Sequence, residues 1–294
     1  MSIMPTVLTS SPFYQALQPT SVTVTDRWIK TGRPIITERP FVTKSGPVSR
    51  MWVGRMNAAK AGHILEPYQL KPVLFGKTAL VAATAFNYIA TPSGPYNEVV
   101  VTVVATPDPA RQKLGLCDLR DFMQFFAAPE AMTREALLTM PTVPFVFAAT
   151  DLFLDKEEPV VIGREMMGLP KQAANVEYNG ENLQDHQMYV FDGKGSLPIS
   201  ARGTTRFPIT VRENGIGKPA QWMRFPVAGR LPETTGPNIP VDVVVRARMA
   251  LELASGKDGL GFGGSLSKKY GDVSMLTSLL FYDMEAGFNY PSRP

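Results

Sequence analysis

The segment GREMMGLPK, from Gly163 to Lys171, holds the residues of this chain that are best placed to do chemistry. Gly163, Gly168 and Pro170 interrupt regular structure, which predicts that Lys171 projects from a loop. A buried ammonium group loses hydration and is driven toward its neutral form, and a neutral amine can attack a ketone to form an imine. On these residues alone, a solvated turn lysine is a commoner explanation than a catalytic one.

The elements that must position this lysine are predicted to be strands. The apolar run 158–162 predicts a buried strand that pairs with residues 145–154. A second hairpin is predicted from residues 78–90 and 99–105, with Glu98 near the start of its second strand. Further strands are predicted near 175–178, 187–191, 197–202, 205–212, 221–227 and 241–253, and helices near 118–140 and 266–280. Many strands and few helices indicate a mainly β protein of α+β class, built on an antiparallel barrel or sandwich.

The lysine segment also resembles a known family. A glycine, Arg164-Glu165, a short and mostly apolar stretch and then Pro170-Lys171 are similar to the active-site signature of the acetoacetate decarboxylase superfamily. The resemblance implies a β-barrel-like fold with a central pocket and a few peripheral helices. It also implies a homo-oligomer that needs no cofactor and forms a Schiff base through Lys171.

Two segments upstream resemble the same family. The sequence GPYNE, which contains Tyr96 and ends at Glu98, is similar to the segment that supplies an active-site glutamate. The sequence RMWVGR, from Arg50 to Arg55, precedes a short predicted helix and resembles the family's opening strand, where an arginine binds the substrate carboxylate. The resemblance therefore implies a role for Glu98, and for either Arg50 or Arg55.

Three features depart from the family pattern. Gln172 stands where decarboxylases of the family usually have a second lysine. Residues 1–45 are expected to form an N-terminal extension before a family-like domain of residues 46–294. That domain carries an inserted segment with a helical pattern at 107–144. Added structure beside a pocket favours a different substrate.

The reaction that the resemblance implies is decarboxylation of a small β-oxo acid through an imine on the lysine. Glu98 and Glu165 are expected to position the amine and move protons. Tyr96, Arg164 and Gln172 are expected to line the substrate site. Arg164 could instead pair with a carboxylate to hold the loop, and Tyr96 could be a packed turn residue.

Two other functions fit the same residues. An aldolase-dehydratase would form the imine with a 2-oxo acid such as pyruvate and condense the resulting enamine with an aldehyde. A non-catalytic barrel would bind an apolar small molecule in the same pocket. Simple apolar binding would not need the polar set of Glu98, Arg164, Glu165 and Lys171.

Composition argues against several other classes of function. The net charge of +4 comes without a basic run, which gives no support for nucleic-acid binding. The start of the chain lacks the charged and apolar regions of a signal peptide, and Cys117 is the only cysteine, so the cytoplasm is the expected location. No window approaches the roughly 20 apolar residues of a membrane helix.

Metal and nucleotide sites are also not predicted. The chain has two histidines, and its carboxylates show no repeated metal-ligand spacing. The glycines at 259–264 satisfy the GxGxxG pattern, but too few residues follow them to complete a βαβ unit. This segment is therefore predicted to be a flexible loop.

Overall fold

The computed structural model describes residues 6–27, 33–113, 145–180, 185–191, 197–204, 221–231 and 240–289. The strand expected at 205–212, the helix expected at 118–140 and Cys117 lie outside these ranges.

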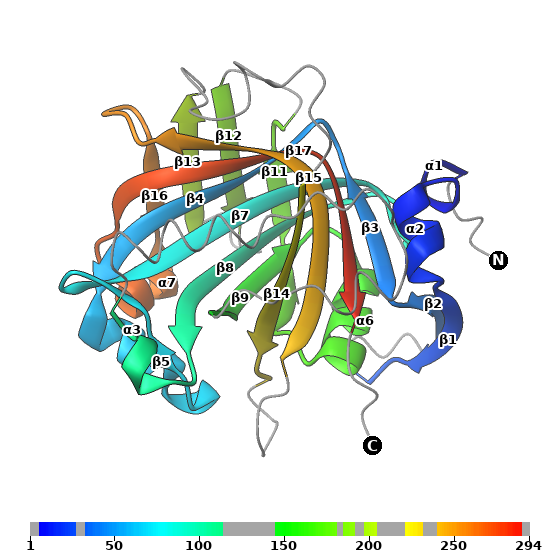
Figure 1. Cartoon of the computed structure of the whole chain (residues 1–294), viewed down its shortest axis with the longest axis horizontal. Coiled ribbons are helices and arrows are strands. Elements are labelled where there is room, and N and C mark those ends of the chain that lie inside the picture. The colour runs from blue at the N-terminus through cyan, green and yellow to red at the C-terminus, as the bar shows by residue number, and fades with distance from the viewer. Residues whose placement is uncertain are drawn as a thin grey trace.

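Seven strands close into a barrel, in which each strand is hydrogen-bonded to two others of the ring (Figure 1). In ring order these are β9 (Val146–Leu154), β14 (Gln221–Gly229), β15 (Val241–Leu253), β17 (Ser274–Asn289), β4 (Val48–Asn57), β7 (Thr78–Ala90) and β8 (Tyr96–Thr106). Every pairing in the ring is antiparallel except that of β14 with β9. The structure confirms the predicted mainly β barrel, with one parallel joint that periodicity did not predict.

Side chains alternate between the inside and the outside of the barrel. One cluster of buried apolar side chains, the interior cluster, joins strands across the ring and includes Leu80 of β7, Val243 of β15 and Phe281 of β17. The other large cluster, the outer cluster, includes Trp52 of β4 and Ala83 of β7 and packs against elements outside the ring. Within a regular stretch of strand, odd-numbered and even-numbered residues therefore face opposite sides of the barrel wall.

A small sheet and two helices cover the outer cluster. The sheet contains β11 (Asn175–Tyr178), β12 (Asp185–Phe191), β13 (Ile199–Thr204) and β16 (Gly259–Phe262), and the helices are α3 (Ala58–Leu65) and α7 (Gly264–Tyr270). Asn57 caps α3 by accepting hydrogen bonds from the backbone of residues 59 and 60. This cap is the usual way in which a helix start satisfies its free N–H groups.

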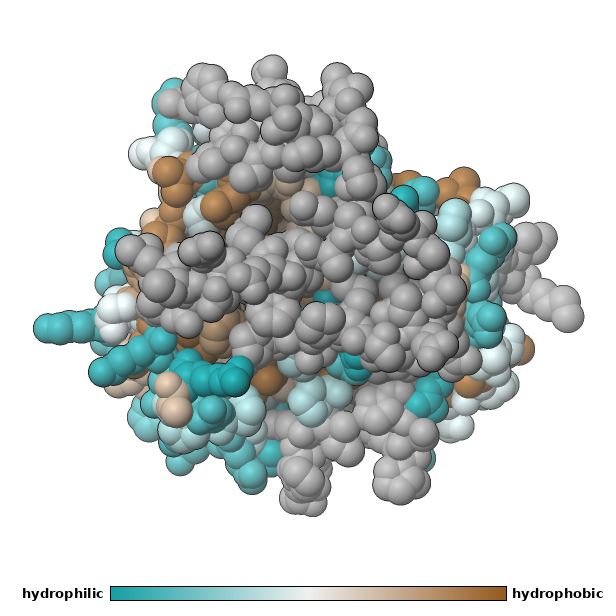
Figure 2. Space-filling model, in the orientation of Figure 1, coloured by the Kyte–Doolittle hydropathy of each residue, from teal (hydrophilic) through white to brown (hydrophobic). Residues whose placement is uncertain are grey.

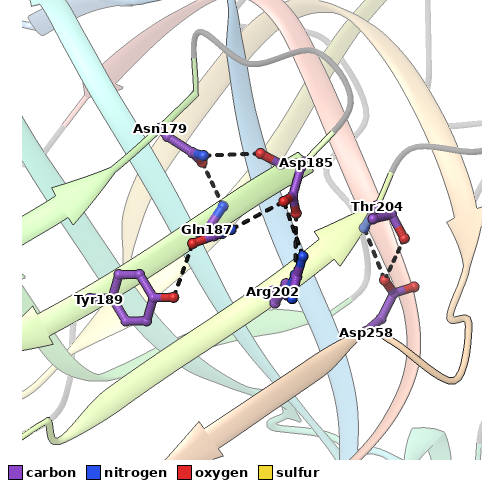
Figure 3. Close-up of polar contacts among 7 residues, drawn as sticks. All are labelled: Asn179, Asp185, Gln187, Tyr189, Arg202, Thr204 and Asp258. Carbon is purple, nitrogen blue, oxygen red and sulfur yellow. Dashed lines mark hydrogen bonds and ion pairs between the residues drawn. The ribbon is translucent and has the colours of Figure 1, made fainter.

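Polar contacts hold the strands of the small sheet in register (Figure 3). Arg202 of β13 pairs with Asp185 of β12 across the strands, with 3.2 Å between Nη2 and Oδ2, and lowers the pKa of that carboxyl through their hydrogen bond. Asp258, just before β16, accepts hydrogen bonds from the backbone N–H of Thr204 at 2.9 Å and from its hydroxyl at 3.2 Å. The small sheet is thus tied together at one end.

The segment expected as an extension contributes to the main sheet. It contains α1 (Thr6–Thr9), α2 (Pro12–Leu17), β1 (Thr20–Thr25), β2 (Pro34–Arg39) and β3 (Phe41–Ser45). Strand β3 pairs with both β17 and β7, so it joins the sheet beside β4. Short elements complete the fold: β5 (Lys71–Pro72), β6 (Leu74–Phe75), β10 (Lys171–Ala173) and the 3-10 helices η1 (Glu66–Tyr68) and η2 (Pro109–Arg111). In the described part of the chain, no helix is long and apolar enough to cross a membrane.

Four local predictions were wrong. Gly163 does not interrupt regular structure but lies inside a helix, and Lys171 begins strand β10 instead of projecting from a loop. Residues 158–162 belong to a helix, α6 (Glu157–Met167), because a short apolar run fits a buried helix as well as a strand. Two glutamates in its first turn and Gly168 after its last residue are helix signals that outweigh the run. Residues 266–280 are divided between α7 and β17, and the GxGxxG segment contains strand β16 rather than a loop.

Candidate active site

Lys171 is held by a turn that follows α6. Gly168 ends this helix in the left-handed conformation, with φ of +65°, and the backbone N–H of Leu169 donates to the carbonyl of Gly163 at 3.0 Å. The chain then enters β10, which runs parallel to β9 and pairs Lys171 with Leu152 of the interior cluster. The lysine is 5% exposed. Lys171 is therefore a buried residue and not the solvated turn lysine that its local sequence allows.

Glu98 is the polar partner of this lysine. The distance from Lys171 Nζ to Glu98 Oε2 is 2.7 Å, and both side chains are buried. Glu98 lies on β8 opposite Phe86 of β7, on the same side of the strands as Tyr96, which belongs to the interior cluster. Burying two charges costs hydration, so such a pair persists only where its geometry is good. The pair gives the barrel interior an amine and a carboxylate in direct contact.

A row of three aromatic rings begins beside the pair. The ring of Tyr96 lies 5.9 Å from the Lys171 amine, and Tyr88 packs 5.0 Å from Tyr96. Phe86 stacks on Tyr88 at 5.2 Å. Burial raises the pKa of the Tyr96 hydroxyl, and the nearby Glu98 carboxylate raises it further, so this phenol stays protonated and keeps its capacity to donate. These rings form an apolar wall, of which the sequence predicted Tyr96 but not Phe86 or Tyr88.

Gly163, the first residue of the motif, makes room for the lysine. A Cβ atom at this position would lie 2.2 Å from Lys171 Cδ and 2.4 Å from Cε, far inside normal contact distance. The aliphatic part of the lysine thus crosses directly over the backbone of α6. The glycine eight residues before Lys171 therefore has a steric role, because a larger residue at position 163 would push the amine away from Glu98.

Arg164 and Glu165, the two charged residues that follow Gly163, have different partners. Arg164 Nη1 donates to the backbone carbonyl of Lys171 at 2.9 Å, which ties the end of α6 to β10. Glu165 Oε2 lies 3.9 Å from Arg27 Nε, while its Oε1 is buried without a hydrogen-bond partner among the described residues. Arg164 is thus a positioning residue, and the structure shows no hydrogen bond that joins Glu165 to the Lys171–Glu98 pair.

Arg50 lies on the other side of the barrel wall from Lys171. It pairs with Ala85 of the outer cluster, and its guanidinium meets Gly203 of the small sheet. Nη2 contacts Glu252 Oε2 at 3.2 Å and the Ser278 hydroxyl at 2.7 Å. The structure does not bring Arg50 to the lysine, because even-numbered residues of β4 face outward.

Arg55 lies on the same face of the barrel wall as the Lys171–Glu98 pair, but far from that pair along the strands. It pairs with Leu80 of the interior cluster, whereas Glu98 pairs with Phe86, six residues further along β7. At about 3.3 Å per residue this separation is roughly 20 Å along the strand. Arg55 is also exposed. A small acid bound to Lys171 would not reach it.

Gln172 points away from the lysine, because successive residues of a strand face opposite sides. It is exposed and lines a separate cavity outside the ring. Met51, on the interior face of β4, packs against the interior cluster. Ser49, which the sequence did not single out, is fully buried on the same face and pairs with Phe281 of β17. Its hydroxyl has no hydrogen-bond partner in the described part of the chain, and strand alternation was the signal that could have found it.

No group of three or more histidine, cysteine, aspartate or glutamate residues within the described ranges could hold a metal ion. The side chains at the Lys171 site supply an amine, a carboxylate, phenols and an apolar wall.

The fold is similar to that of solved acetoacetate decarboxylases. The enzyme from Legionella pneumophila subsp. pneumophila str. Philadelphia 1 is 12% identical, with a TM-score of 0.52 over 99% of this chain and 95% of that chain. A second acetoacetate decarboxylase structure is 12% identical, with a TM-score of 0.52 over 90% of this chain and 93% of that chain.

A third similar structure is the enduracididine biosynthesis enzyme MppR, complexed with the condensation product of pyruvate and imidazole 4-carboxaldehyde. It is 11% identical, with a TM-score of 0.50 over 87% of this chain and 89% of that chain. No family model matches the sequence, and no curated protein matches it significantly. The structural likenesses show that the chain has the acetoacetate decarboxylase-like fold.

Proposed function

We propose that the protein is an enzyme that forms a Schiff base between Lys171 and a small oxo acid, and that it decarboxylates a β-oxo acid. The observation that carries this proposal is the buried contact between Lys171 and Glu98, with 2.7 Å between Nζ and Oε2, inside the barrel. The lysine stem also passes over Gly163, and the ring of Tyr96 lies 5.9 Å from the amine. The acetoacetate decarboxylase-like fold supports the same chemistry.

The proposed reaction uses the two charged groups in turn. Glu98 takes a proton from the Lys171 ammonium, and the neutral amine attacks the ketone carbon of the substrate. Loss of water gives a protonated imine. The bond to the substrate carboxylate then breaks, carbon dioxide leaves, and the electron pair moves into the imine to give an enamine. The proton that Glu98 first took leaves in the expelled water, so Glu98 passes a second proton, taken from solvent, to the enamine carbon. Water then hydrolyses the imine to release the ketone and the free lysine.

The wall around the lysine suits this bond cleavage. A carboxylate held against Phe86, Tyr88 and Tyr96 would lose much of its hydration, which favours its departure as neutral carbon dioxide. Tyr96 keeps a hydroxyl that can donate to the substrate. Neither Arg50 nor Arg55 is placed to hold that carboxylate, so we assign no arginine to substrate binding.

A second reaction, aldol condensation followed by loss of water, is favoured by one comparison. MppR, whose fold is similar, is described in complex with a condensation product of pyruvate. The first step would be the same imine on Lys171, formed with a 2-oxo acid. Its enamine would then attack an aldehyde instead of taking up a proton, and the product would keep the carboxylate.

Borohydride reduction in the presence of β-oxo and 2-oxo acids tests the common step. We expect a reduced adduct on Lys171, located by intact mass and peptide mapping, and no adduct in Lys171→Ala. Lys156→Ala is the matched control, since Lys156 is also partly buried but donates to the carbonyl of Ser93. Carbon dioxide release from the acid that traps best would distinguish decarboxylation from condensation. A folded protein that traps none of these acids would instead be a non-catalytic small-molecule-binding barrel.

A further inference from the structure

A large cavity with several cationic side chains in its lining lies outside the barrel, behind the strand that carries the lysine. Its volume is about 920 Å³, within the usual size range of ligand pockets. Helices α3 and α7 supply much of its lining, and hydrophilic side chains dominate the part of the surface in Figure 2 where Figure 1 places α3. Pro170 and Gln172, the two neighbours of Lys171, complete one side. The proposed imine chemistry uses none of these side chains.

A β-bulge builds the floor of this cavity. Val101 of β8 pairs with Asp151, but the next residue, Thr102, pairs with Ala149, so Thr150 is the extra residue on β9. Both Thr150 and Asp151 consequently line the cavity. The Asp151 carboxylate accepts from the Tyr270 hydroxyl and from Lys269 Nζ, the latter at 2.6 Å. The one carboxylate of the lining is therefore already neutralised by partners within the protein.

The remaining charges of the lining are positive. With Lys269 paired to Asp151, they belong to Lys60, Lys268 and Arg230. His63 also lines the cavity but lies 3.7 Å from Glu66, so it is not counted among the groups that face a ligand. These three cationic side chains, beside one carboxylate that Lys269 neutralises, leave the cavity with a positive potential.

The lysines are held in place by the protein. Lys60 Nζ donates to the carbonyl of Lys268 at 2.9 Å, and its side chain lies against Gly271, where a Cβ would be 3.1 Å from Cδ. Lys268 and Lys269 lie in the last turn of α7, where the free carbonyls of the helix end favour cations. These contacts offset part of the repulsion between the lysine ammonium groups when no anion is bound.

We propose that this cavity binds a phosphorylated small molecule. Ammonium groups from two helices suit a compact, multiply charged phosphate, which accepts from several directions. Ile64, Pro67, Tyr68 and Pro170 supply a less polar wall on which the organic part of such a molecule can pack. Pro170 and Gln172, the two neighbours of Lys171, line the cavity, so the site lies directly behind the strand that carries the lysine.

Isothermal titration with AMP, inorganic phosphate, adenosine and citrate, at low ionic strength, tests this assignment. We expect saturable binding of one AMP per chain, competition by phosphate, weakening as salt is added, and no binding of adenosine. The double variant Lys60→Gln/Lys268→Gln should weaken AMP binding about tenfold or more. The control Lys77→Gln/Lys257→Gln removes two exposed lysines that do not line the cavity and should change the affinity less than about twofold.

Circular dichroism and thermal unfolding of both double variants establish that they are folded. AMP binding should be unchanged in Lys171→Ala. This result makes the test of the cavity independent of the test of the imine chemistry. The assignment would be overturned by a lack of saturable AMP binding, by an equal loss in both double variants, or by binding of citrate without binding of AMP or phosphate.

Discussion

Replacing Gly163 by alanine should disable the lysine while leaving the fold intact. The new Cβ would lie 2.2 Å from Lys171 Cδ, whereas carbon atoms normally approach to about 3.5–4.0 Å, so the lysine must move by roughly 1.3–1.8 Å. A shift of that size breaks the 2.7 Å contact between Nζ and Glu98. Misplacement of a reacting group by about 1 Å can cost about a hundredfold in rate, so imine trapping should slow by that factor.

Stability should change much less than activity in this variant. Overpacking costs about 1–3 kcal/mol, but the lysine stem can yield, and alanine favours the helix over glycine by about 1 kcal/mol. The free energy of unfolding, measured with denaturant, should therefore fall by no more than about 2 kcal/mol. Gly62→Ala in α3 is the matched control, because a Cβ there meets nothing within 4 Å. It should leave trapping unchanged. A folded Gly163→Ala protein that forms the borohydride adduct at the normal rate would refute this account of the site.

Three other substitutions test the remaining assignments. Glu98→Gln should slow borohydride trapping about a hundredfold, since an amide cannot take the amine's proton, and an unchanged rate would remove Glu98 from the mechanism. Gln172→Lys should change that rate by less than about twofold, because residue 172 faces away from the amine, and a larger effect would contradict that geometry. Arg50→Met should cost about 3–5 kcal/mol in denaturant unfolding by removing the guanidinium that lies 3.2 Å from the buried Glu252 carboxylate, without slowing trapping. The double variant Arg50→Met/Glu252→Leu should recover much of this loss, and slow trapping in folded Arg50→Met would return the arginine to the substrate site.

The strands of the barrel were largely predictable because their hydrophobic runs are long. Residues 78–90 and 241–253 match β7 and β15. Prediction failed at 158–162, where four apolar residues after a glutamate fit either helix or strand. It failed again at 266–280, where a helix ends at Tyr270 and a strand begins at Ser274. Short segments take their conformation from tertiary packing rather than from propensity.

The sequence by itself determined which residue types could do chemistry: the motif around Lys171, the glutamate at 98 and the glycine at 163. These are local properties, since they depend on residue identity and on spacing within one segment. Only the tertiary structure decided which of them meet. Arg50 and Ser49 are adjacent in the chain, yet one lies under the small sheet and the other faces the barrel interior. The physical reason is the alternation of a strand, in which the register of hydrogen bonds with distant segments decides which face is inside.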